Sequence, residues 1–192
     1  MTTTGFIGVK LAGPPIVCFK EGTMIDIMDN NSKQETQVKV EDIRKGMYVK
    51  TYQHGFLPVK HVAFKTIENP ETNDRIEKRL YICDQAKYPT LKEPLIMTGC
   101  HSILIDESEY TDIQKKMIRE QNGMLFKTDD KFRLPVMYDD KAAPYCVKGE
   151  YKVWHICLEH FDQEMNYGIY ANGLLVESCS ERNICLAEYD HV

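Results

Sequence analysis

The sequence has 192 residues, of which 43% are hydrophobic and 28% charged, the composition of an ordinary globular protein. A net charge of −5 lacks the basic surface that nucleic-acid binding needs, and no apolar run reaches the roughly 18 residues of a membrane span. Seven scattered cysteines without a Cys-x-x-Cys pair argue against a zinc site and a dense disulfide framework. We therefore expect no nucleic-acid or membrane partner, no metal or other cofactor, and a reducing intracellular compartment.

The first half of the chain predicts β-strands. Residues 1–17 are rich in Gly and Pro toward their end and predict a flanking lead-in segment, not a domain. Beyond them, residues 24–28 form an apolar run that ends in the turn cluster 29–32. Further strands are expected at residues 38–40, 47–52 and 56–64, with a short helical turn at 40–46.

The second half adds strands and one helix. Strands are predicted at residues 79–83, 102–105, 132–137 and 151–158. Thr111 and Gln114 have capping-box spacing, Asn122-Gly123 forms a helix end, and Ile113 and Met117 share one helical face. The fold class predicted is therefore all-β, with one short, mostly polar helical insertion at about residues 108–122.

Cys18 is the first candidate for chemistry. A lone cysteine is most often a small buried apolar residue. A cysteine can also attack the carbonyl of the residue before it, here Val17, in an N-to-S acyl shift that converts the amide into a thioester. That reaction needs a held peptide bond, a proton for the leaving amine and a donor for the oxyanion. Thr98 and His101, three residues apart beside Gly99, match this need.

Three segments together carry a resemblance to a known superfamily. They are Cys18 with the following Phe and Gly-Thr, the Thr-Gly-Cys-His run at 98–101, and Tyr-Gly-Ile-Tyr-Ala-Asn-Gly-Leu-Leu-Val-Glu-Ser at 167–178. In this order they resemble the Hint superfamily of inteins and Hedgehog autoprocessing domains, most closely the Hint domains of large DNA viruses and related bacterial proteins. The resemblance implies a disc of curved hairpins with pseudo-two-fold symmetry over residues 18–180, a flank at 1–17 and a tail at 181–192.

The resemblance also implies roles for individual residues. Cys18 would be the nucleophile that cleaves the Val17-Cys18 bond, and Thr98 and His101 would polarise and protonate that amide. His155 falls where the superfamily often has a polar residue that assists the same step. His101 and His155 could instead be ordinary core histidines.

The end of the third segment departs from the intein pattern. Inteins end in His-Asn followed by Cys, Ser or Thr, whereas this chain has Glu177, Ser178 and Cys179. Without the Asn, full protein splicing is not expected, although Cys179 occupies the acceptor position and could form a branched thioester. The Asn172-Gly173 pair predicts a hairpin turn that brings the last strand beside the strand of Cys18.

These patterns favour an autoprocessing domain whose substrate is its own N-terminal flank and whose acceptor is water or a small nucleophile. An alternative is a catalytically retired Hint domain that serves as a structural or assembly module, for instance in a virion protein. A cysteine hydrolase that acts on other proteins is a third reading, which no sequence feature supports.

Overall fold

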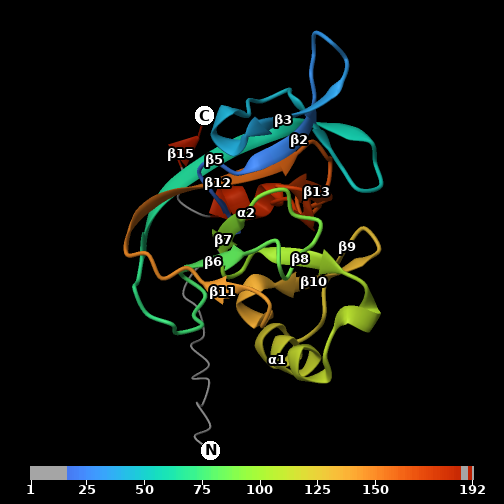
Figure 1. Ribbon diagram of the computed structural model, residues 1–192. Helices are drawn as coiled ribbons and strands as arrows, with labels where there is room; N and C mark the ends of the chain where they lie inside the picture. The colour runs from blue at the N-terminus through green and yellow to red at the C-terminus, as the bar shows by residue number, and fades with distance from the viewer. Residues whose placement is uncertain (1–16, 187–189, 192) are drawn as a thin grey trace, which may run out of the picture.

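In the computed structural model, the described part of the chain covers residues 17–186, 190 and 191, and the predicted flank at 1–16 lies outside it. The predicted all-β class is confirmed (Figure 1). The strands are β1 (Phe19–Lys20), β2 (Met24–Met28), β3 (Glu35–Lys39), β4 (Tyr48–Lys50), β5 (Phe56–Asn69), β6 (Leu80–Cys83), β7 (Leu95–Thr98), β8 (Ser102–Ile105), β9 (Lys127–Thr128), β10 (Lys131–Pro135), β11 (Ala143–Pro144), β12 (Gly149–Leu158), β13 (Gly168–Ala171), β14 (Leu174–Glu177) and β15 (Asp190–His191). The helices are α1 (Asp112–Asn122) and α2 (Glu181–Leu186), with short 3₁₀ turns η1 (Val40–Asp42), η2 (Glu107–Glu109) and η3 (Val136–Tyr138).

The strands pair in the order β11-β6-β7-β1-β12-β5-β4-β2-β13-β14-β8-β10-β9, with β3 added to β2 and β15 added to β5. The long antiparallel ladder between β5 and β12 is the spine of this arrangement, and the two strands curve side by side across the molecule (Figure 1). The start of β5 pairs with β4 and its remainder with β12, so one strand joins the two halves of the order.

Two of the passages of the chain between these halves are alike, because each runs through a three-residue connection. It passes from β1, beside β12, to β2, beside β13, and later from β7, beside β6, to β8, beside β10. This repetition agrees with the predicted pseudo-symmetry. The core fills the space between the halves, with Ile25, Val49, Leu95, Ile156 and Ile169 all fully or almost fully buried.

Helix α1 is the predicted insertion, and its ends are those that the sequence indicates. Thr111 and Gln114 form the capping box, and Gly123 ends the helix in the left-handed conformation. Ile113 is 72% exposed, and the buried residues of the helix are Gln114 and Ile118. The Gln114 amide donates to the Tyr138 carbonyl, which turns this side of the helix inward.

The C-terminal segment after residue 180, predicted as a tail, contributes packed structure. Ile184 of α2 is buried in the cluster that also contains Cys18, and β15 pairs with β5. No helix of the described residues has the length and apolarity needed to cross a bilayer.

The Asn172-Gly173 pair forms the predicted turn between β13 and β14, and both residues have positive φ. The Asn172 side chain accepts from the Met24 N–H and donates to the Pro94 carbonyl, so the turn also fastens two other segments. The expectation that this turn places the last strand beside that of Cys18 is wrong. Strand β14 pairs with β13 and β8, whereas β1 lies between β7 and β12.

A pair of glycine substitutions tests this turn. Gly173 has φ +91°, and a Cβ there would lie 2.6 Å from the Thr90 carbonyl oxygen, whereas Gly55 also has positive φ but faces open space. We expect Gly55→Ala to lower the free energy of unfolding by about 1–2 kcal/mol. Gly173→Ala should cost roughly 1–3 kcal/mol more because of the added overlap. Urea unfolding measures both, and equal costs would contradict the close approach.

Candidate functional site

Cys18 lies at the entrance of β1, in the interior of the molecule. Its neighbour Phe19 pairs with Trp154 on β12 and with Met97 on β7, so the chain is held between two strands as soon as β1 begins. Cys18 has 0% exposure, and Val17 is also buried. The Val17-Cys18 peptide bond therefore sits in a fixed, desolvated position.

Thr98, the last residue of β7, binds both main-chain groups of Cys18. The Cys18 N–H donates to Thr98 Oγ1 at 2.9 Å, and the Thr98 N–H donates to the Cys18 carbonyl at 3.0 Å. The Thr98 hydroxyl thus accepts a hydrogen bond from the nitrogen of the candidate scissile bond. These contacts join segments 80 residues apart.

His101 reaches the same place through a tight turn after β7. The His101 N–H donates to the Thr98 carbonyl at 3.0 Å. Gly99 permits this turn, since a Cβ there would lie 2.7 Å from the Glu77 carbonyl oxygen. The imidazole is 1% exposed and packs on the Phe19 ring, with centroids 4.2 Å apart.

The hydrogen bond of the imidazole defines its tautomer. Nε2 of His101 lies 2.9 Å from the Glu177 carbonyl oxygen, which can only accept, so Nε2 carries the hydrogen. In the neutral ring Nδ1 is then the basic nitrogen. Burial lowers the pKa of His101, and the nearby Glu177 carboxylate and the main chain of Glu177 and Cys18 oppose this in part.

His155 is brought to the edge of this site by β12. It is buried beside Trp154, and burial lowers its pKa well below the usual range, with the positive charges of His101 and Lys65 acting in the same direction. His155 is thus close enough to His101 to sense its charge. A neutral imidazole at this position can accept or relay a proton.

Cys179, the candidate acceptor, lies in the same buried cluster as Cys18 and Cys157. Its N–H donates to the Ile156 carbonyl at 2.8 Å, which fixes the chain just beyond β14 against β12. Burial raises the pKa of the Cys179 thiol well above the usual range, and the neighbouring Cys18 and Cys157 act in the same direction. The two ends of the predicted domain therefore meet at these thiols.

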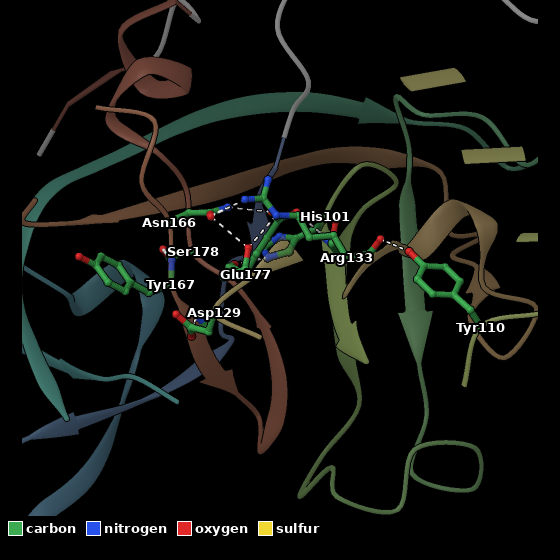
Figure 2. A network of polar contacts seen from close by, with 11 residues as sticks. His101, Tyr110, Asp129, Arg133, Asn166, Tyr167, Glu177 and Ser178 are labelled. Carbon is green, nitrogen blue, oxygen red and sulfur yellow. Dashed lines mark hydrogen bonds and ion pairs between the residues drawn. The ribbon is translucent and has the colours of Figure 1, made fainter. Parts of the chain in front are cut away.

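Polar residues that the sequence did not indicate surround the far side of His101 (Figure 2). The Glu177 carboxylate accepts from the Ser102 N–H and from Asn166 Nδ2, each at 3.0 Å, and lies 3.4 Å from Arg133 Nε. A charged residue at the end of an apolar run, Leu-Leu-Val-Glu, is the one sequence signal of this buried network. Its partners come from other strands and cannot be identified from spacing.

A cavity of about 280 Å³ borders the acyl side of the candidate scissile bond. Its lining includes Val17, Cys100 and Glu177, together with Arg133 and residues of α1. Within the described part of the chain no cluster of His, Cys, Asp and Glu has an arrangement that could hold a metal ion.

A comparison with solved structures finds the crystal structure of the gp41-1 intein, with 14% identity, a TM-score of 0.39 and coverage of 83% of this chain and 96% of that chain. A likeness of this degree does not by itself assign a family or a function. No protein-family model matches the sequence, and neither does any curated protein.

Removal of the Thr98 hydroxyl tests its place on the Cys18 nitrogen. In a Cys18→Ala background, Thr98→Val should lower the free energy of unfolding by about 1–3 kcal/mol, because a buried N–H is left without its acceptor. Thr98→Ser keeps the acceptor and should cost less. Thr36→Val, at an exposed position of β3, is the control and should change little. Equal losses for the Val and Ser variants in urea unfolding would contradict the hydrogen bond.

The two buried histidines predict a loss of stability in mild acid. Their folded-state pKa values lie below the usual 6.5, so the unfolded chain takes up protons first as the pH falls. Stability is then complete above pH 6.5 and declines below it, by up to about 1.4 kcal/mol per pH unit for each histidine. His155→Leu should reduce this slope in urea unfolding between pH 5 and 7. A slope that His155→Leu does not alter would contradict the assignment.

Proposed function

We propose that this chain is an autoprocessing domain of the Hint superfamily that cleaves its own Val17-Cys18 bond through a thioester. The observation that carries the proposal is the Thr98 hydroxyl, 2.9 Å from the Cys18 nitrogen, with His101 on the turn that follows. The residues of the three segments also favour a narrower inference, a resemblance to the Hint domains of large DNA viruses and related bacterial proteins. This narrower inference rests on the sequence alone.

The acyl shift begins with proton transfer. Nδ1 of His101, the basic nitrogen of the ring, accepts the proton of the Cys18 thiol, and the thiolate attacks the Val17 carbonyl carbon. The carbon-sulfur bond forms as the carbonyl oxygen gains negative charge. When the intermediate collapses, the bond from this carbon to the Cys18 nitrogen breaks, and the imidazolium returns the proton to that nitrogen.

Thr98 contributes geometry to this step. Its Oγ1 and N–H hold the nitrogen and carbonyl of Cys18, which fixes the main chain on the amine side of the scissile bond. Such fixed placement lowers the barrier because the entropy of alignment is lost on folding and not during the reaction.

The thioester is resolved by water or a small nucleophile. Cys18 itself is fully enclosed, but Val17 lines a cavity of about 280 Å³, and we propose this cavity as the route of a small molecule to the acyl carbon. Attack there releases the flank as a carboxylic acid or adduct and returns the proton to the Cys18 sulfur. Cys179, in the same cluster, is a second acceptor and would produce a branched thioester.

The C-terminal residues favour cleavage without splicing. Ser178 stands where an intein has its terminal Asn, and its Oγ accepts from the Tyr167 N–H at 2.9 Å. A hydroxyl cannot form the cyclic imide that releases a downstream segment. The same substitution also suits the alternative of a retired structural module, which retains the fold but does not react.

Treatment of the purified chain with dithiothreitol or hydroxylamine separates the two functions. We expect mass spectrometry to show release of residues 1–17 and a fragment that begins at Cys18, because the thioester is trapped by either reagent. Cys18→Ala should abolish release and His101→Gln should slow it at least about 100-fold, the usual contribution of a general acid-base residue.

Two cysteine variants complete this design. Cys185→Ala, at an exposed position on α2, should cleave at the rate of the unchanged chain. With added nucleophile, Cys179→Ala should also cleave at the rate of the unchanged chain, and only the branched thioester product should be absent. A chain that stays whole with every nucleophile, while unfolding cooperatively, would contradict cleavage and favour the structural module.

A further inference from the structure

Glu177 contacts the His101-Ser102 segment at two points. Its main-chain carbonyl accepts from His101 Nε2 at 2.9 Å, and its carboxylate Oε1 accepts from the Ser102 N–H at 3.0 Å. The last residue of β14 therefore holds both the ring of the histidine and the peptide that follows it (Figure 2).

The other carboxylate oxygen of Glu177 is held as firmly. Oε2 accepts from Asn166 Nδ2 at 3.0 Å and lies 3.4 Å from Arg133 Nε. Arg133 and Asn166 are themselves bonded to each other and to Thr128. Glu177 is only 4% exposed, and a carboxylate so buried is costly unless its charge and hydrogen bonds are satisfied. The network satisfies them in one geometry.

We propose that Glu177 is a positioning residue for His101, which keeps the ring in the Nε2–H tautomer and stabilises the imidazolium that forms during the acyl shift. This inference rests on the proposed function for its catalytic part only. The tautomer and the charge of the ring are properties of the folded chain and can be measured without cleavage.

The charges around the ring agree with this role. The Glu177 carboxylate favours the imidazolium, and Arg133 on β10 forms an ion pair with this carboxylate. His155 on β12 opposes the imidazolium only when it is itself protonated. Cys18 before β1 and Cys100 in the turn after β7 are thiols, and burial together with Glu77 raises the pKa of Cys100. Glu177 is thus the anionic group that favours the charged form of the ring.

NMR of the imidazole nitrogens in a Cys18→Ala chain tests the inference directly. In this uncleaved chain His101 should be the Nε2–H tautomer. Glu177→Gln keeps the main-chain carbonyl and the shape of the side chain but removes the charge. We expect the same tautomer and a lower pKa for His101. Asp139→Asn, which neutralises a buried carboxylate bonded to Tyr88 and not to His101, should leave the His101 pKa unchanged.

The cleavage arm uses the chain with Cys18 intact. Glu177→Gln should slow release of residues 1–17 about tenfold or more and move the rising limb of the pH-rate profile to lower pH, because a weaker base loses its proton sooner. Glu177→Asp, which retains the charge, should recover part of the rate. A Glu177→Gln chain with an unchanged His101 pKa, or slowed only in proportion to its unfolded fraction, would overturn the inference.

The two arms separate this inference from the proposed function. If no variant and no nucleophile gives cleavage, the proposed function fails, and the NMR titration still decides whether Glu177 controls the tautomer and charge of His101. If Glu177→Gln does not fold, the Glu177→Asp chain provides the NMR test. The Asp side chain keeps the charge but is shorter. We therefore expect it to lose the hydrogen bond to the Ser102 N–H, while the pKa of His101 stays close to its value in the chain with Glu177.

Discussion

The hydrogen bonds between Thr98 and Cys18 are the contact on which the rest of the site depends. They close the gap between β7 and the entrance of β1, and they leave neither main-chain group of Cys18 without a partner in the interior. A buried N–H without an acceptor costs about 1–3 kcal/mol, so sequence positions 80 apart are coupled by an energy that matters to folding. The turn that carries His101 then follows from the end of β7.

Local sequence patterns were sufficient for most elements of the fold. The apolar run at β2, the near-continuous β12 and the capping box of α1 predict those elements because each depends on neighbours along the chain. The expected neighbour of β14 was wrong, and the burial of Gln114 on α1 had no signal in the sequence. Both depend on the residues that lie opposite, such as the Tyr138 carbonyl that accepts from Gln114, and no periodicity contains that information.

The candidate site divides in the same way. Cys18, Thr98 and His101 could be selected from residue types and order, and the structure brings them together. Their chemical roles stay predictions. The sequence marks Glu177 only as a departure from the histidine of the intein pattern and gives no signal for Arg133 or Asn166, because a buried ion network is defined by strands that meet in space. His155 lies at the edge of the site, where its charge would disfavour protonation of His101.

The enclosure of Cys18 has a consequence for the direction of the reaction. In the proposed reaction, the opened amide leaves an α-amine at the Cys18 nitrogen, which lies 2.9 Å from an uncharged hydroxyl, Thr98 Oγ1. A low-dielectric interior disfavours the ammonium form. The free amine is the species that attacks a thioester and restores the amide, so in the proposed reaction the two isomers interconvert within the folded chain. The yield of cleavage then depends on two competing rates, that of acceptor attack on the thioester and that of the return of the thioester to the amide.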